Sequence, residues 1–120
     1  MIMRSEIEGT KAFNLITMGG FRLGVNIDGP AAQVALDPDS PPIQVLTPTV
    51  AIDVLLPDET DATSKGLVFL IYNDAAAASG FTLSVKENDD TTAVDTLAEQ
   101  TGAVFFCDGT QWLAVRGSAT

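Results

Sequence analysis

The segment AVFFCDGTQWLAV, at residues 103–115, carries the strongest indication of the fold in this sequence. Two apolar runs flank the polar segment Asp108-Gly109-Thr110-Gln111. An Asp-Gly pair between two apolar runs is a strong signal for a β-hairpin, because glycine accepts the backbone conformation that a tight turn needs. We therefore expect strands over residues 103–107 and 112–115, joined by this turn.

The segment before this hairpin repeats the same pattern of short strands and turns. Residues 67–72 (LVFLIY) are rich in β-forming residues and lie between Gly66 and Asn73-Asp74. A run this short is too short for a stable helix, and its continuous apolar character favours a strand that is covered on both faces. Residues 75–78 (AAAA) are cut off by Gly80 and are expected to form a loop tip.

Other segments alternate between apolar and polar residues, as strands with one buried face do. In residues 51–56 the pattern turns Ile52, Val54 and Leu56 inward, and Pro57 ends the strand. Short strands are expected at residues 33–36, 43–46, 81–86 and around 94–97, with a three-proline segment at 37–42 that excludes helix. Seven or eight short strands without a credible helix predict an all-β fold, a short-stranded antiparallel sandwich, jelly-roll or barrel-like body.

The composition excludes several classes of function. The 120 residues carry 6 Lys and Arg against 16 Asp and Glu, a net charge of −10, which disfavours binding to nucleic acid and to anionic membranes. Histidine is absent, so there is no imidazole base for a Ser-His or Cys-His nucleophile. Cys107 is the single cysteine and is expected to be a small buried apolar residue. No apolar run is long enough for a membrane helix, and the first residues do not read as a signal peptide.

The charge is divided unevenly between two parts of the chain. Residues 1–30 have no net charge and hold five of the ten glycines, whereas residues 31–120 hold the whole excess of acid. We interpret residues 1–30 as an extended N-terminal arm that becomes ordered against a partner, and residues 31–120 as the β body. The alternative is that residues 1–30 supply one or two strands to the same domain. The apolar side chains of the arm are Phe13, Leu15, Ile16, Met18, Phe21 and Leu23.

Three pairs of acidic residues are candidates for chemistry: Asp37 with Asp39, Asp58 with Asp61, and Asp89 with Asp90. Paired carboxylates serve glycoside hydrolysis when they flank a cleft, but solvated turn residues are the simpler interpretation. Calcium could bind to oxygen ligands of one of two loops, formed by Asp58, Glu59 and Asp61 or by Asn88, Asp89 and Asp90. Trp112 is expected in a core or an interface, with a ligand platform as the alternative.

The order of segments from Leu56-Pro57 to Arg116 resembles the small β modules of tailed-bacteriophage structural proteins. The resemblance consists of a strand ending in Leu-Pro, a loop with Lys65-Gly66, the strands at 67–73 and 81–86, an Asp-rich turn, and the closing segment VFFCDGTQW at residues 104–112. Capsid decoration (cement) proteins, head fibres and tail-fibre segments belong to this group. The resemblance covers about half of the chain and implies a trimeric virion protein without enzymatic activity or cofactor.

A cement protein clamps the junctions between capsomers and stabilises the head against the pressure of packaged DNA. For this chain we expect the major capsid protein and other copies of the chain as partners, and no nucleic acid or membrane. The protein would be made in the host cytoplasm and lie on the capsid surface of the virion. Several arms on one trimer would bind with avidity. The arm is the candidate capsid contact, and the candidate residues for the trimer interface or the core are Leu67, Phe69, Ile71, Phe81, Leu83, Val85 and Trp112.

Two other functions remain open at this point. The same β segment, with Trp112 and the acidic loops, fits a tail-fibre or head-fibre module that recognises host-surface glycan. A small glycosidase that uses Asp58 and Asp61, or Asp89 and Asp90, is the third possibility.

Overall fold

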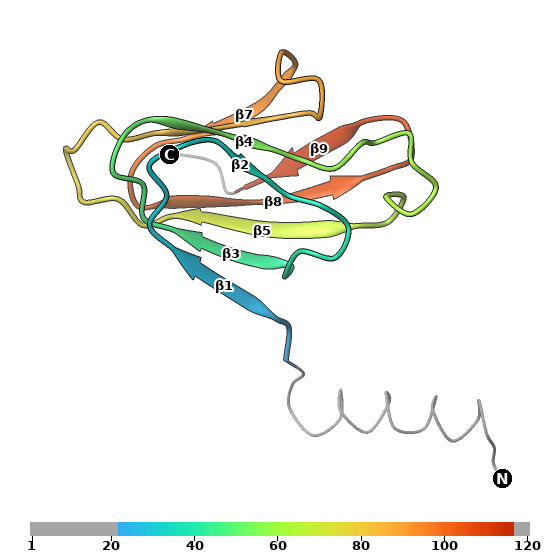
Figure 1. Cartoon of the computed structure of the whole chain (residues 1–120), viewed down its shortest axis with the longest axis horizontal. Coiled ribbons are helices and arrows are strands. Elements are labelled where there is room, and N and C mark those ends of the chain that lie inside the picture. Colours follow the sequence, from blue (N-terminus) through green and yellow to red (C-terminus); the bar gives the residue numbers. More distant parts are fainter. Residues whose placement is uncertain (1–21, 117–120) are drawn as a thin grey trace, which may run out of the picture.

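A computed structural model describes residues 22–116, which form nine strands in two stacked sheets (Figure 1). The strands are β1 (Val25–Asp28), β2 (Val34–Ala35), β3 (Ile43–Leu46), β4 (Ile52–Leu55), β5 (Val68–Asn73), β6 (Leu83–Lys86), β7 (Ala93–Leu97), β8 (Thr101–Cys107) and β9 (Trp112–Val115). The described residues contain no helix of the length and hydropathy that crossing a bilayer requires.

The chain alternates between the two sheets. The first sheet has the strand order β1-β3-β5-β8-β9, and the second sheet has the order β2-β4-β6-β7. Each of the first five strands is followed by a crossing to the other sheet, so that successive strands in one sheet are added side by side. The prediction of an all-β fold is confirmed.

Strand direction differs from the antiparallel expectation. Within the first sheet, β1, β3 and β5 are parallel, and within the second sheet β2, β4 and β6 are parallel. A chain that leaves a sheet, crosses the other sheet and returns enters from the same end each time, which makes these strands parallel. The pairs β5–β8, β6–β7 and β8–β9 are antiparallel, so both sheets are mixed.

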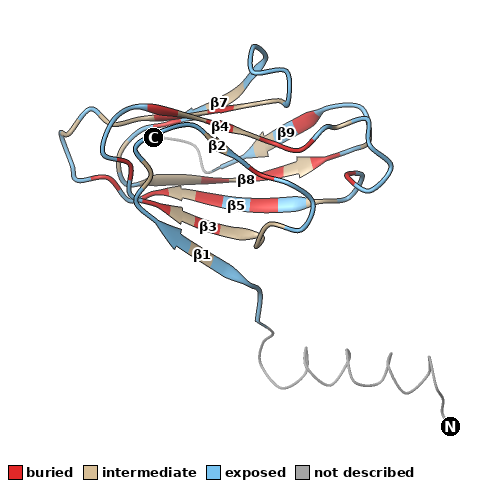
Figure 2. Cartoon of the chain, in the orientation of Figure 1, coloured by how far each residue is buried: buried red, intermediate tan, exposed pale blue. Residues whose placement is uncertain are grey.

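The core lies between the two sheets and takes the inward side chain of nearly every strand (Figure 2). Ile52, Val54 and Leu56 are buried, which confirms the predicted inward set of that strand. Phe69 and Trp112 meet with their ring centroids 5.9 Å apart. The indole N–H of Trp112 also donates a 2.9 Å hydrogen bond to the Pro57 carbonyl, so the closing hairpin is fixed to the loop after β4.

Most of the other predicted segments lie where the sequence placed them. The hairpin at residues 103–115 forms β8 and β9, with Gly109 at a φ of 103° in the turn. Residues 75–78 form no helix, and Cys107 is buried. The interpretation of residues 1–30 as an arm falls mainly on residues 1–21, which lie outside the described residues. Pairing with the body begins at Val25, because β1 lies beside β3.

Candidate interaction surfaces

The outer side of the five-stranded sheet is a continuous apolar surface. In a strand, side chains alternate between the two faces, so the registers identify the residues that point away from the core. We call this surface the outer apolar face, and its residues are Val25, Ile27, Ile43, Val45, Val68, Leu70, Tyr72, Gly102, Val104, Phe106, Leu113 and Val115. None of these residues carries a charge.

Much of this face is exposed. Ile27 is 76% exposed and Val115 is 57% exposed on the two edge strands, while Val68 and Leu70 on the central strand β5 are 49% and 42% exposed. In Figure 2 the ribbon of β5 alternates between buried and exposed residues, and β1 is mostly exposed. The sequence predicts cover on both faces of this strand, yet the described chain covers only the inner one.

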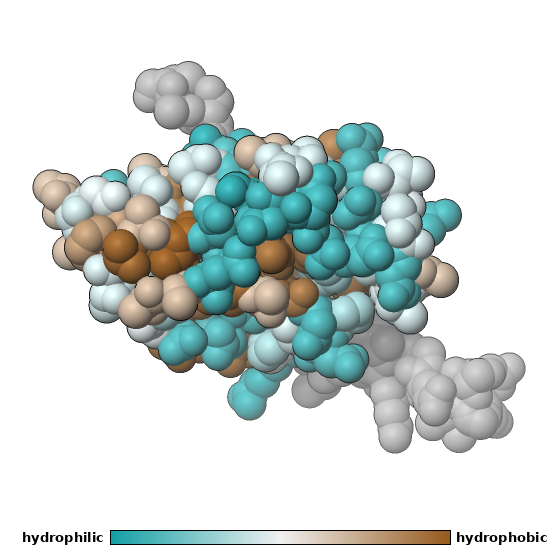
Figure 3. Space-filling view, turned by 45° about the horizontal axis from the view of Figure 1, so that its top comes forward, coloured by the Kyte–Doolittle hydropathy of each residue, from teal (hydrophilic) through white to brown (hydrophobic). Residues whose placement is uncertain are grey.

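The second sheet has a different outer side. Its outward positions hold Asp53, Ser84, Lys86 and Thr96 beside Ala35 and Leu55, so this face is mostly polar. Lys86 lies 3.1 Å from Asp53, and its hydrogen bond to that carboxylate raises the pKa of the lysine. Figure 3 brings this side of the molecule forward and shows polar residues over much of it. The apolar character is therefore specific to the first sheet.

Tyr72 and Gly102 lie on the outer apolar face near the end of β5 and the start of β8. They are paired across β5 and β8, and a Cβ on Gly102 would lie 3.0 Å from both the Ile71 carbonyl oxygen and the Tyr72 ring. The Tyr72 hydroxyl donates a 3.2 Å hydrogen bond to Gln100. The ring thus lies close to the strand backbone where a side chain on residue 102 would otherwise stand.

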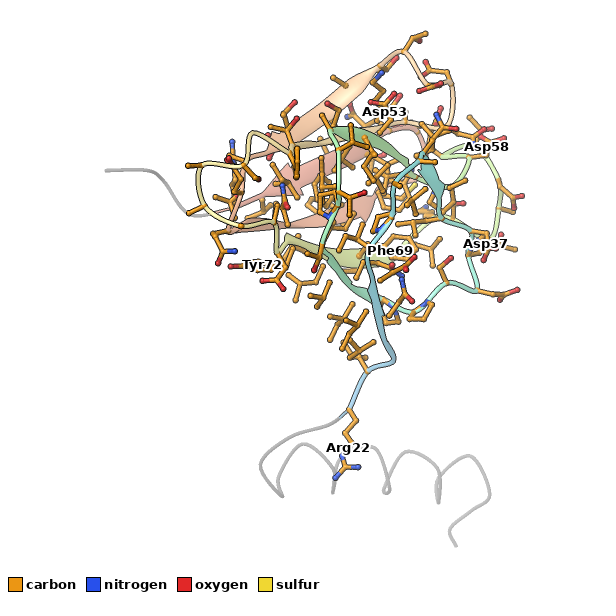
Figure 4. All side chains as sticks on the ribbon, turned by 60° about the vertical axis from the view of Figure 1, so that its left-hand side comes forward. Arg22, Asp37, Asp53, Asp58, Phe69 and Tyr72 are labelled. Carbon is orange, nitrogen blue, oxygen red and sulfur yellow. The ribbon has the colours of Figure 1, made fainter. Side chains whose placement is uncertain are left out.

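A second surface of distinct character lies at one end of the sandwich. The strand directions place the loops 36–42, 56–67, 87–92 and 108–111 at the same end, because they follow β2, β4, β6 and β8. We call this surface the acidic end. It carries nine of the acidic residues: Asp37, Asp39, Asp58, Glu59, Asp61, Glu87, Asp89, Asp90 and Asp108. Figure 4 shows Asp37 and Asp58 at this end, with Phe69 in the interior.

Most of the aspartates in these loops organise their own turns. Asp108 Oδ1 accepts hydrogen bonds from the backbone N–H groups of Thr110 and Gln111, both at 2.9 Å, and these bonds lower its pKa from 3.8 to about 2. Asp89 accepts from Thr92 and Thr91, which also lowers the pKa of Asp89. Asp61 accepts in the same way from Thr63, with a lowered pKa. These carboxylates thus have turn partners, which is the simpler of the two interpretations of the acidic pairs.

In the loops considered for calcium, Asp58, Asp61 and Asp89 accept hydrogen bonds within their own turns. Among residues 22–116, no three His, Cys, Asp or Glu side chains converge in a way that could hold a metal ion. Asp58 Oδ1 accepts from the backbone and the hydroxyl of Thr60, rather than facing Asp61.

The residues predicted for the trimer interface or the core lie mainly in the core. The side chains of Phe69, Ile71, Leu83, Val85 and Trp112 are buried between the sheets, while Leu67 packs against this core and Phe81 is half-buried. Of the predicted contact residues of the arm, Leu23 is exposed. The remainder, Phe13, Leu15, Ile16, Met18 and Phe21, lie outside the described residues.

Trp112 is 3% exposed, so it does not present an open platform for a sugar ring. Its backbone N–H donates a 3.2 Å hydrogen bond to Glu87, and its indole is held by Pro57. Of the features behind the glycan-recognition alternative, which also include the β segment and the acidic loops, Trp112 is therefore a core residue.

Comparison of the chain with protein-family models, with curated proteins and with solved structures finds no match in any of the three. The function is therefore argued from the surfaces themselves.

The sequence reasoning did not single out the outer apolar face as a site. Its signal was present in residues 67–72, where Val68, Leu70 and Tyr72 are as apolar as the buried Phe69 and Ile71 between them. The run predicted a strand with two covered faces, but the sequence did not indicate what would cover the second one.

Proposed function

We propose that the protein is a virion structural protein, a capsid decoration or cement protein that acts through protein–protein contacts. The observation that carries this proposal is the outer apolar face, which has no charge although the chain as a whole carries −10. Exposed apolar surface of this extent is typical of proteins that work in an assembly. The resemblance of residues 56–116 to phage structural modules supplies the kind of assembly.

The two parts of the chain have separate roles in this proposal. The arm contacts the major capsid protein, and its last part, β1, joins the arm to the rim of the first sheet by pairing with β3. The body links three arms into a homotrimer, so that each arm can be weak while the whole trimer binds tightly by avidity. The acidic end faces solvent and repels neighbouring trimers and DNA.

Capsid binding is tested with shells assembled from the major capsid protein encoded with this chain. We expect the full chain to co-sediment with the shells to saturation and to lie at threefold positions in electron micrographs. A triple variant of the arm, Phe13→Ser with Leu15→Ser and Ile16→Ser, should lose this binding by tenfold or more.

A matched triple variant on the outer side of the second sheet, Ala35→Ser with Ser84→Ala and Thr96→Ser, serves as the control and should bind as the native chain does. Failure of the native chain to bind shells contradicts the cement function. If the arm variant binds shells as tightly as the native chain does, only the proposed role of the arm is contradicted.

A further inference from the structure

The outer apolar face is unusual for a sheet surface that faces water. Half-buried sheets alternate apolar residues inward with polar residues outward, as the second sheet does at Asp53, Ser84 and Lys86. Val68, Leu70 and Val115 break that rule on the first sheet, and each is at least 42% exposed. Strands that are apolar on both faces are normally the middle layer of a larger packing.

The size of this face is that of an interaction surface. Five strands at a spacing of about 4.8 Å, each roughly five residues long, give a face of roughly 400 Å² in projection. Its accessible area is larger, because side chains such as Ile27 stand above the sheet. One partner of a standard interface contributes about 800 Å², so this face supplies a large part of a weak to moderate contact.

The charge distribution favours an identical partner. Nine acidic residues lie at the acidic end, and none lies on the outer apolar face. Two copies can therefore meet through this face without bringing carboxylates together, while contact through the acidic end would be opposed by repulsion. Around a threefold axis, one part of this face on each copy contacts another part of the same face on the next copy, and the ring closes after three copies.

We infer that the outer apolar face is covered by the same face of other copies of this chain. The contact between copies is made by the outer side of β5 and its neighbours, because the inward residues are already buried in the core of each copy. These inward residues are Phe69, Ile71, Leu83 and Val85. The expected number of three copies rests on the proposed function, whereas the face itself is argued from the structure.

The first test is the mass of the assembly in solution, measured by light scattering on the full chain. The native protein should form a species of three 12.6 kDa chains that dissociates on dilution. Leu70→Glu places a charge in the middle of the outer apolar face and should shift the dissociation constant upward by at least a hundredfold. Leu55→Glu makes the same change on the outer side of the second sheet, next to Lys86, and should leave the mass unchanged.

Salt gives a second readout, since the contact buries no charge. Raising the sodium chloride concentration should strengthen the association, because it screens the repulsion between chains of charge −10. A partner held by ion pairs would respond in the opposite direction.

Cross-linking tests the face without a disruptive charge, in case Leu70→Glu fails to fold. Cys107 is buried, so Leu70→Cys introduces the accessible thiol among the described residues. A bismaleimide linker of about 10 Å, close to the thickness of an apolar core between sheets, should join Leu70→Cys chains in high yield. Ser84→Cys, on the outer side of the second sheet, should stay unlinked at the same protein concentration.

Each outcome decides between occupants. A native chain that stays a single copy at all concentrations overturns the inference and points to residues 1–21 or to a different protein as the cover. An assembly that Leu70→Glu leaves intact also overturns it. A two-copy species supports self-association through the outer apolar face and contradicts the homotrimer of the proposed function. Absence of shell binding by an intact assembly contradicts only the proposed capsid function.

Discussion

Asn73 is a fully buried polar residue at the end of β5, and its side chain joins the two layers of the sandwich. Its Nδ2 donates to the carbonyls of Phe81 and Leu97 at 2.9 and 3.0 Å, and its Oδ1 accepts from the N–H of Ala75 at 2.9 Å. One amide thus satisfies three backbone groups, two in the loop after β5 and one at the end of β7. A buried amide with all its partners in place fixes a single arrangement of those loops.

Replacement of Asn73 by Leu should cost about 3 kcal/mol or more of the free energy of unfolding, because each buried backbone group left unpaired costs about 1–3 kcal/mol. Urea denaturation measures the change. Asn88→Leu is the matched control: it removes one long 3.4 Å bond to the Leu56 carbonyl near the surface and should cost less than about 1 kcal/mol. Similar losses in the two variants would show that Asn73 does not hold the loops.

Asp108 gives a prediction about pH. Its pKa is about 2 in the folded chain against an ordinary 3.8, because Thr110 and Gln111 donate to its carboxylate. The lowered pKa of Asp108 stabilises the fold at pH values above the ordinary pKa of 3.8. This contribution is lost as the pH falls from about 4 toward 2. Asp108→Asn should therefore reduce stability at pH 7 and flatten the loss of stability on acidification.

Thermal melts between pH 7 and pH 2 measure this effect. Asp39→Asn is the control, since the Asp39 carboxylate accepts none of the hydrogen bonds found among residues 22–116. An acid dependence of the Asp108→Asn variant as steep as that of the native chain would contradict the role of this carboxylate.

Among the elements, the hairpin of β8 and β9 shows how a turn sets the register of two strands. Gly109 has a φ of 103°, and a Cβ there would lie 3.2 Å from the Lys65 side chain of the loop before β5. The turn thus requires glycine for its backbone and also lies against a second loop. Register in the hairpin in turn brings Trp112 opposite Cys107, facing the core.

Gly109→Ala should destabilise the protein by about 1–3 kcal/mol, the usual cost of a side chain at a positive φ. Gly24→Ala is the control, because Gly24 has no positive φ and a Cβ there would make an ordinary 3.5 Å contact with Pro41. Chemical denaturation followed by Trp112 fluorescence measures both. Equal stability of the two variants would contradict the need for glycine in the turn.

At the scale of the whole molecule, the sandwich has one core that both sheets share. Phe69 of the first sheet lies in its interior (Figure 4), in one buried cluster with Val54, Val85 and Leu97 of the second sheet. A single shared core is typical of cooperative unfolding. Separate unfolding of one sheet would expose the apolar inner side of the other.

Phe69→Ala should cost about 3–5 kcal/mol, as large-to-small changes of a buried aromatic residue do. Circular dichroism and Trp112 fluorescence should report the same lowered midpoint, because one core holds both sheets. Leu55→Ala, at a half-buried position outside the core, should cost less than half as much. Midpoints that separate in the native chain would show that the sheets unfold independently.

The local features of this protein could be predicted from short stretches of its sequence. The period of two in residues 51–56 and 81–86 identified most of the inward residues, since a strand side chain can reach only one of two faces. The Asp-Gly pair located the hairpin, because few residues accept the backbone angles of a tight turn. The burial of Cys107 and the loop at residues 75–78 were likewise predicted from the neighbouring residues in the sequence.

The pairing of the strands and the contacts of each sheet face depend on the tertiary structure. Strand order and direction depend on contacts between residues far apart in the sequence, so local periodicity did not reveal the parallel crossings between the two sheets. Likewise, residues 67–72 are apolar at every position, so this pattern alone does not indicate that Phe69 is buried and Leu70 is exposed. The fold buries Phe69 and exposes Leu70, because the second sheet covers one side of β5 and leaves the other as the outer apolar face.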